Sequence, residues 1–515
     1  MLGSGKPGVW VELVLLAVSP TWDNGYDPPP APPPPPLTML LALLFSLLTV
    51  LSVYGLHRLL LLFHFRWNEA VAQDAPGAPA WETPRVVVQL PLFNERTVAA
   101  RLIAAAAELK WPLDRLEIQI LDDSTDETRE LVDREVSALV ARGVDATVVR
   151  RSNRTGYKAG ALDLGMKLAK GDLFCVFDAD FIPQPDFLER TVSRFRDPRI
   201  GMVQARWGHL NRDESQLTRA QSTLLDGHFV IEHTVRHHRG LFFNFNGTAG
   251  VWRRATIEGA GGWQHDTLTE DLDLSYRAQL AGWKFLYIPG VVAPAEVPPG
   301  IAAFKSQQHR WAKGSVQVYR KLWRRILAGD VSAKIKMEAL MHLTGNVGYP
   351  LVLGLALVLP LTLPLQESIP WWVHSGALFA CTLPVIMFYD SSQRVQGRSA
   401  RDRVRDVPSA MALGVGMSVS QTRAVIEGLG RETGVFVRTP KRGAVDMPRQ
   451  SGYKPSWSGW LGFGVVELGL SVWSAWAVVQ AVQLGLWGAL PFLLLFFVGF
   501  GWVGSLSLAA KFERH

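Results

Sequence analysis

The sequence predicts an α/β domain with a doubly wound, mostly parallel sheet, inserted between transmembrane α-helices. Of the 515 residues, 48% are hydrophobic and only 19% are charged, whereas charged residues make up about a quarter of a typical soluble domain. Long charge-free apolar runs are confined to the two ends of the chain, while residues 85–325 alternate polar and apolar positions as a globular domain does. The chain is therefore too apolar to be wholly soluble, and its middle is not a membrane segment.

Five membrane-spanning helices are expected from the apolar runs. Residues 37–56 form a charge-free stretch of 20, which at 1.5 Å per residue matches a hydrocarbon core of about 30 Å, so we place the first transmembrane helix in 37–66. Residues 345–389 are long enough for a second and a third helix, and 457–510 for a fourth and a fifth. Residues 1–36 are expected to hold an interfacial helix and a Pro-rich spacer.

Basic residues mark the segments expected on the cytoplasmic side. Residues 326–344 form a basic interfacial linker, and 390–456 hold two basic loops around an apolar stretch at 407–429. The positive-inside tendency places both loops in the cytoplasm, so that stretch should lie on the membrane surface or dip in and return. An odd number of spans then puts the N-terminus outside.

Charge and cysteine content indicate the compartment of the central domain. The net charge of +7 fits contacts between basic loops and anionic membrane lipids better than nucleic-acid binding. Cys175 and Cys381 are the two cysteines, which excludes a disulfide framework and suits a reducing compartment, so we expect a cytosolic domain. The Arg-, Ala- and Gly-rich composition favours a bacterial inner membrane, with a Golgi membrane as the alternative.

Strands alternate with helices in the first half of the central domain. Helical patterns begin at Arg96, Thr125 and Lys158. The β-rich apolar runs lie at 86–90, 116–121, 147–150 and 173–177. Such a series predicts a parallel sheet covered on both faces, with the ligand at the carboxyl ends of the strands.

Carboxylates follow three of these strands. Glu95 follows the first, Asp122 and Asp123 the second, and Asp178 and Asp180 the fourth. Acidic clusters at one sheet edge repel one another unless a cation lies between them, so they predict a divalent metal with a phosphorylated substrate. Asp122 taken alone fits a helix N-cap equally well.

Other catalytic classes lack their motifs. No GxxxxGK[ST] sequence occurs and no GxGxxG follows a strand, which excludes a P-loop protein and disfavours a dinucleotide enzyme. Two cysteines cannot form a structural zinc site. Metal-assisted transfer from a phosphate leaving group is the class that remains.

A set of short motifs points to one family. In chain order they are LFNE (92–95), DDSTDET (122–128), NRTGYKAGAL (153–162), FDADF (177–181), VQARW (203–207), FNGTAGVWRR (245–254), TED (269–271) and QQHRW (307–311). The set resembles the processive family-2 glycosyltransferases, most closely the plant cellulose-synthase-like families A and C and their bacterial relatives. Those enzymes make mannan, glucomannan or β-1,4-glucan backbones. The resemblance covers roughly 85–325 together with similar membrane flanks.

This resemblance implies a GT-A fold and an inverting transfer from a nucleotide-sugar, GDP-mannose or UDP-glucose, to a growing polysaccharide. It makes Asp271 the general base, because a sugar hydroxyl is too weakly acidic to attack unaided. Asp178 and Asp180 would hold Mg²⁺ or Mn²⁺. The residues implied to bind the nucleotide-sugar are Phe93, Glu95, Asp122, Asp123, Lys158, Asp178, Gln307 and Arg310, and those implied to bind the acceptor are Asn246, Gly247, Glu270 and Trp311. FVRTPK at 436–441 resembles a gating loop.

Two rival functions stay open at this point. A non-processive enzyme that adds one sugar to a membrane lipid would share the Asp motifs. A membrane transporter or an inactive scaffold is the rival from another class, although a transporter would place its ionisable residues within the spans. The donor base and sugar are not fixed by the sequence.

Overall fold

The computed structural model describes residues 35–68, 82–430 and 457–512. The expected interfacial helix and most of the Pro-rich spacer in 1–36, and the expected gating loop at 436–441, lie outside the described residues. The central domain is built on one seven-stranded sheet in the order β3-β2-β1-β4-β6-β5-β7. Strand β6 pairs antiparallel with both β4 and β5, and the other pairings are parallel. The predicted mostly parallel sheet is confirmed.

The strands are β1 (Val86–Leu92), β2 (Leu116–Asp122), β3 (Ala146–Val149), β4 (Leu173–Val176), β5 (Ile200–His209), β6 (Gly250–Arg253) and β7 (Lys284–Ala295). The α-helices of this domain are α4 (Ala99–Ala107), α5 (Thr128–Ala141), α6 (Tyr157–Leu168), α7 (Phe187–Val192), α8 (Gln216–Asp226), α9 (His233–His238), α10 (Arg254–Gly259), α11 (Glu270–Leu280) and α12 (Ile301–Ala328). Short 3₁₀ turns are η1 (Leu113–Arg115), η2 (Ser193–Arg196) and η3 (Arg212–Glu214), and η4 (Gly227–Glu232) is a π-helix. The four strands predicted in the first half of the domain form, and β5, β6 and β7 were not predicted.

Alternation along the strands divides the core between the two faces of the sheet. Val86 and Val88 of β1 pack into one hydrophobic cluster, whereas Val87 packs into the other. Successive side chains of a strand point to opposite faces, so a run of apolar residues buries both. Helices α4 and α6 both contact β1. The carboxyl ends of the parallel strands are left as the open edge of the domain.

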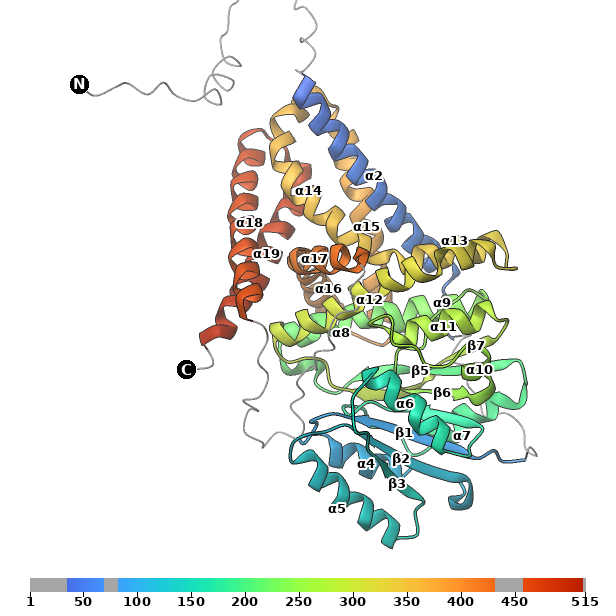
Figure 1. Cartoon of the computed structure of the whole chain (residues 1–515). Coiled ribbons are helices and arrows are strands. Elements are labelled where there is room, and N and C mark those ends of the chain that lie inside the picture. Colours follow the sequence, from blue (N-terminus) through green and yellow to red (C-terminus); the bar gives the residue numbers. More distant parts are fainter. Residues whose placement is uncertain (1–34, 69–81, 431–456, 513–515) are drawn as a thin grey trace, which may run out of the picture.

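Helices outside this domain form the second part of the molecule (Figure 1). They are α2 (Pro35–His64), α13 (Ala333–Leu343), η5 (Gly345–Val347), α14 (Gly348–Thr362), η6 (Leu363–Ser368), α15 (Trp371–Val395), α16 (Ala400–Gly416), α17 (Ser418–Leu429), α18 (Trp457–Gln483), η7 (Trp487–Ala489) and α19 (Leu490–Phe512). Four stretches among the described residues are long and apolar enough to cross a membrane: Thr38–His64, Gly345–Leu365, Gly462–Gln483 and Trp487–Ala510. They coincide with four of the five expected spans.

The third expected span and the apolar stretch at 407–429 are not among these four stretches. Of the expected third span at 370–389, residues 371–389 fall in α15, which is not among those four stretches, so its passage through a membrane stays a prediction. The stretch 407–429 is divided between α16 and α17, and neither is among the four. Helix α16 packs against α8 and α19, and α17 packs against α12 and α14. These two helices thus lie between the sheet domain and the apolar helices, as Figure 1 shows.

Helix α12 connects the two parts through a buried ion pair. The ammonium of Lys305 lies 2.5 and 2.8 Å from the carboxylate oxygens of Glu467 on α18 and 2.8 Å from the hydroxyl of Ser507 on α19. The Lys305 side chain is 1% exposed and that of Glu467 is fully buried. Such a pair is costly to break, because either partner alone is an uncompensated buried charge. The sheet domain is therefore fixed to the apolar helices.

Candidate active site

A cleft of about 180 Å³ opens at the carboxyl edge of the sheet. It is closed on one side by α12 and by the loop that leads into α11. The predicted site residues that line it are Phe93, Glu95, Asp123, Lys158, Asp178, Asp180, Asn246, Gly247, Glu270, Asp271, Gln307, Arg310 and Trp311. A single water needs only roughly 10–15 Å³, so the cleft has room for a much larger ligand.

Asp122 is the predicted site residue that does not line the cleft. Its side chain is fully buried, its Oδ2 accepts from the Arg150 guanidinium at 2.9 Å, and its Oδ1 accepts from the backbone N–H of Ser124 at 3.0 Å. Consecutive residues at the end of a strand point to opposite faces, so Asp122 and Asp123 cannot both face the ligand. Asp122 holds the end of β2 in place, and it is not the N-cap of a helix, since α5 begins at Thr128.

The Phe93 ring and the Arg154 guanidinium form one end of the cleft. The Arg154 guanidinium lies over the ring of Phe93, 3.3 Å from its centroid, and 3.8 Å from Asp123. Arg151 binds the same Asp123 carboxylate through Nε at 3.0 Å and through Nη2. The flat Phe93 ring and the Arg154 cation provide a stacking surface beside a positive charge, which is what a nucleotide base next to a phosphate requires.

Lys158 and Asp178 form an ion pair in the middle of the cleft. Lys158 Nζ contacts Asp178 Oδ1 and donates to the backbone carbonyl of Gly247 at 2.8 Å. Burial alone would lower the pKa of Lys158, but the carboxylates of Asp178 and Glu270 outweigh it and hold that pKa above its ordinary value. Lys158 is therefore a cation in the cleft. The backbone N–H of Asp178 donates to the Thr248 hydroxyl at 2.9 Å, which ties β4 to the loop before β6.

The donor set at the end of β4 suits a divalent cation. Asp178 and Asp180 lie in the turn that follows β4, and both line the cleft. The Asp178 side chain is 35% exposed and Asp180 is 7% exposed. Carboxylate oxygens that reach a common cleft are the ligands that Mg²⁺ and Mn²⁺ prefer, so these residues fit such an ion.

Asp271 lies at the start of α11 and faces the same cleft. Its burial and the neighbouring Glu270 carboxylate raise its pKa to about 7. Gly247 has a φ of 83°, which favours glycine, and an added Cβ there would lie 2.9 Å from Asp271 Oδ2, so the carboxylate would have to shift. A carboxyl with a pKa near neutrality can accept a proton at physiological pH and release it again.

Helix α12 supplies the wall opposite the sheet. Gln307, Arg310 and Trp311 of α12 line the cleft, and the charge of Arg310 acts on Asp271. The Trp311 ring lies 6.4 Å from that of Trp207 at the end of β5, and Trp207 in turn stacks on Phe229 at 4.8 Å. Two tryptophan rings at one wall offer flat apolar faces to the C–H surface of a sugar.

Arg154 and Trp207 line the cleft but were not predicted to act there, and neither was Arg151, which binds the cleft residue Asp123. Arg151 and Arg154 both pair with Asp123, which directly follows β2 and is distant from them in sequence. Trp207 ends the motif VQARW, and its indole nitrogen is buried without a hydrogen-bond partner among the described residues. Trp207 lies near the carboxyl end of β5, and this position was the available signal, because the carboxyl ends of strands meet at the ligand.

The sequence of the domain that holds the cleft matches that of a known protein family. Residues 84–314 match the family model "Glycosyltransferase like family 2". This part of the chain therefore matches a glycosyltransferase family 2 domain, the family that the motifs predict.

The similar proteins include plant enzymes. "Glucomannan 4-beta-mannosyltransferase 9" of Arabidopsis thaliana is 40% identical over 313 residues, which are 58% of this chain and 57% of the relative. "Glucomannan 4-beta-mannosyltransferase 2" of the same plant is 48% identical over 244 residues, or 46% of each chain. Among solved structures, a mannosyltransferase from Pyrobaculum calidifontis in complex with GDP-Man and Mn²⁺ is 22% identical with a TM-score of 0.49, covering 76% of this chain and 99% of that one. The chain spans about half the length of the curated relatives it matches.

Proposed function

We propose that this protein is a membrane-embedded, inverting glycosyltransferase that extends a β-linked hexose polysaccharide of mannan, glucomannan or glucan type from a nucleotide-sugar. The observation that carries the proposal is Asp271, a carboxyl with a pKa of about 7 that faces the same cleft as the Lys158–Asp178 pair and Trp311. Such a cleft joins a base, an anion-binding group and a sugar platform. The family-2 domain and the similarity to plant mannosyltransferases support it.

Asp271 accepts the proton of the attacking acceptor hydroxyl. The new bond forms between that oxygen and the anomeric carbon of the donor, and the bond from this carbon to the diphosphate breaks. The nucleoside diphosphate leaves with the electron pair, from the face opposite the attack, so the anomeric configuration inverts. Lys158 and Arg310 stabilise the negative charge on the departing diphosphate.

A divalent cation, Mg²⁺ or Mn²⁺, bound by Asp178 and Asp180 would neutralise charge on the donor diphosphate. Phe93 and Arg154 stack against the nucleotide base, and Glu95 and Asp123 line the same end of the cleft.

The acceptor end of the growing chain lies against the wall that α12 forms. Trp311 and Trp207 stack on sugar rings, and Gln307 donates or accepts hydrogen bonds beside them. Asn246, Gly247 and Glu270 surround the reacting hydroxyl next to the base. This platform keeps the product bound between additions, which a polymerase requires and a single-transfer enzyme does not.

The similarity to glucomannan mannosyltransferases favours GDP-mannose as donor, with UDP-glucose as the other candidate. We place the cleft on the cytosolic face of a bacterial inner membrane, where nucleotide-sugars are made, with the polymer leaving through the apolar helices.

The test uses the full chain purified in detergent with labelled GDP-mannose and, separately, UDP-glucose. We expect one donor to give products many sugars long, which a matching β-mannanase or β-glucanase digests. The Asp271→Asn enzyme is the control, and it should bind the donor within a few-fold of the parent while losing transfer by about 10²–10⁴. Single-sugar adducts on lipid would replace the proposal with the non-processive enzyme, and no turnover of any donor would leave an inactive scaffold or a transporter.

A further inference from the structure

The side-chain amide of Asn246 is held from behind by two histidines. Its Oδ1 lies 2.8 Å from Nε2 of His233, and its Nδ2 lies 3.0 Å from Nε2 of His228. Its backbone N–H donates to Oε1 of Gln204 at 3.0 Å. Asn246 itself lines the cleft beside Gly247. Each polar atom of the amide therefore has a histidine nitrogen as a partner, and the amide nitrogen keeps a second hydrogen.

The protonation of His233 follows from its second partner. Nε2 of His233 also lies 3.1 Å from the backbone carbonyl of Asn244, an atom that can only accept. His233 must therefore carry its hydrogen on Nε2. Burial lowers the pKa of His233 well below its ordinary value, so the ring is neutral and its other nitrogen carries no hydrogen. That other nitrogen, Nδ1, has no hydrogen-bond partner among the described residues, as an unprotonated nitrogen in an apolar surrounding can tolerate.

The orientation of the Asn246 amide is then fixed by elimination. Since His233 Nε2 donates, the amide atom beside it must be the acceptor Oδ1, which puts the amide nitrogen beside His228. That nitrogen can only donate, so Nε2 of His228 must be the acceptor and the hydrogen of His228 must lie on Nδ1. His228 Nδ1 lies 3.1 Å from Oε2 of Glu232, which accepts it. Each donor in this series meets an acceptor.

Glu232 is held in turn by a buried cation. The Arg236 side chain is fully buried, and its Nε donates to Oε1 of Glu232 at 3.0 Å. The pKa of Glu232 is well below its ordinary value: burial would raise it, but Arg236 and His228 outweigh that effect. The carboxylate is ionised, so it keeps the His228 hydrogen on Nδ1 and leaves Nε2 as the acceptor.

The π-helix η4 explains why both histidines reach one amide. In a π-helix each backbone hydrogen bond joins two residues that are five apart in the sequence, so the side chains of such residues lie on one face of the helix. His228 and His233 are five residues apart, and their rings lie 4.2 Å from each other. An α-helix would turn the two rings away from each other. The π-helical turn therefore allows His228 to bond the amide nitrogen of Asn246 while His233 bonds its oxygen.

We infer that His228 and His233 are positioning residues that fix the Asn246 amide so that it presents an N–H donor, and not its carbonyl oxygen, to the cleft. This inference rests on the proposed function. The neighbouring Gly247 lies against the carboxylate of Asp271, so the Asn246 N–H is placed to donate to the oxygen of the acceptor hydroxyl whose proton Asp271 removes. A donor at that oxygen selects a hydroxyl oriented with its hydrogen toward the base.

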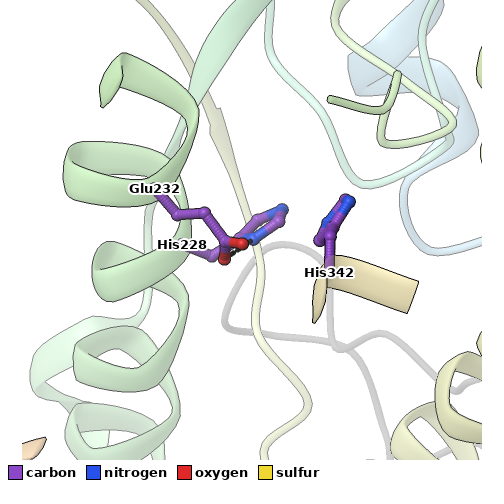
Figure 2. A group of neighbouring side chains, drawn as sticks. All are labelled: His228, Glu232 and His342. Atoms are coloured by element: carbon purple, nitrogen blue, oxygen red, sulfur yellow. Dashed lines mark hydrogen bonds and ion pairs between the residues drawn. The ribbon is translucent and has the colours of Figure 1, made fainter. Parts of the chain in front are cut away.

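A metal ion is the competing interpretation of these side chains. One ligand atom each of His228, Glu232 and His342 lie within 4.8 Å of one another, and Figure 2 shows the three side chains converging from two segments. His342 Nδ1 lies 2.7 Å from the hydroxyl of Tyr276. Because His228 already has a partner at each nitrogen and Glu232 has one at each oxygen, the hydrogen-bonded arrangement is complete without an ion.

A double-mutant cycle between His228 and Asn246 tests the positioning role. The four proteins are the parent, His228→Phe, Asn246→Ala and the double variant, each as the full chain in detergent. We expect His228→Phe to lower polymer extension roughly ten-fold, which corresponds to one buried hydrogen bond left unmade, while hydrolysis of the donor to free sugar stays near the parent rate. In the Asn246→Ala background the same change should have no further effect on extension.

Two variants separate positioning from general damage. His228→Gln keeps an acceptor oxygen and should recover part of the extension. His237→Phe is the matched control, since His237 lies on α9, contacts Phe243 and does not line the cleft, and it should leave extension unchanged. Equal losses of extension and hydrolysis in His228→Phe, or additive losses in the double variant, would overturn the inference.

Two further measurements decide the contact even if the parent extends no polymer, which would refute only the proposed function. In thermal unfolding of the same four proteins, the lowering of Tm in the double variant should be smaller than the sum of the single effects. Additive Tm effects would show that the two side chains do not interact. The metal content of the purified parent and of the His342→Ala variant should be the same. If the parent holds a stoichiometric transition metal that the variant lacks, His228 Nε2 binds that metal and the inference is overturned.

Discussion

The pH dependence of sugar transfer follows from the surroundings of Asp271. Burial and the Glu270 carboxylate raise its pKa from 3.8 to about 7. A base acts only when it is ionised, so the active fraction of the enzyme falls as the pH drops through that pKa. With a pKa of about 7, the ionised fraction is roughly nine-tenths at pH 8 and roughly one-tenth at pH 6, a loss of about ten-fold, whereas a carboxyl at its ordinary pKa would lose about 1% or less.

The assay is the initial rate of transfer at acceptor concentrations well below KM, across a buffer series of constant ionic strength. Under those conditions the rate reports kcat/KM and hence the pKa of the free enzyme. Glu270→Gln is the matched variant: it removes a negative charge that raises the pKa of Asp271, so the midpoint of its profile should move to lower pH whatever its maximal rate. A profile that is flat from pH 6 to 8, or a midpoint that rises in Glu270→Gln, would refute the assignment of the base.

Three further expectations concern the metal, the buried ion pair and the packing of α12. EDTA should silence the enzyme, Mg²⁺ or Mn²⁺ should restore it, and Asp180→Ala should remove metal-dependent donor binding; activity in metal-free buffer would contradict this. Lys305→Met leaves Glu467 as an unpaired buried charge, which should cost about 3–5 kcal/mol and lower Tm, while adding Glu467→Leu should recover much of the loss; an unchanged Tm would mean that the pair is not formed. Gly314→Ala puts a Cβ 2.5 Å from Cγ2 of Thr269, which lies two residues before Asp271. Transfer should therefore fall while nucleotide binding persists, and full transfer activity would show that the loop before α11 shifts without cost.

The ends of strands explain which parts of the site the sequence could predict. Asp178 and Asp180 closely follow β4 and both line the cleft, and their place after an apolar run is visible in the sequence. Side-chain alternation separates Asp122 from Asp123, and applying that rule would have removed Asp122 from the site. Strand ends and acidic clusters are local signals, which is why the sheet edge could be placed without a structure.

Contacts between distant segments explain what the sequence could not predict. Asn246 and His228 are 18 residues apart, and nothing local marks the π-helical turn that brings His228 beside the amide. Strand β6 (Gly250–Arg253) begins with a glycine and ends with an arginine, so it is not the uninterrupted apolar run that marked β4. Its antiparallel insertion between β4 and β5 depends on tertiary pairing. The partner of Lys305 lies 162 positions away, so the buried pair could not be inferred from either segment.

The apolar side chains of α12 that pack against the membrane-associated helices limit how the protein can be shortened. Phe304 of α12 and Leu217 of α8 are buried in one cluster with Leu413, Met417 and Val503, which come from α16, the turn after it and α19. A fragment that stops after α12 would present Phe304, Leu217 and the neighbouring apolar groups to water, and surfaces of that kind aggregate. We therefore expect the smallest unit that folds to be larger than the sheet domain and to need detergent even when only nucleotide chemistry is under study.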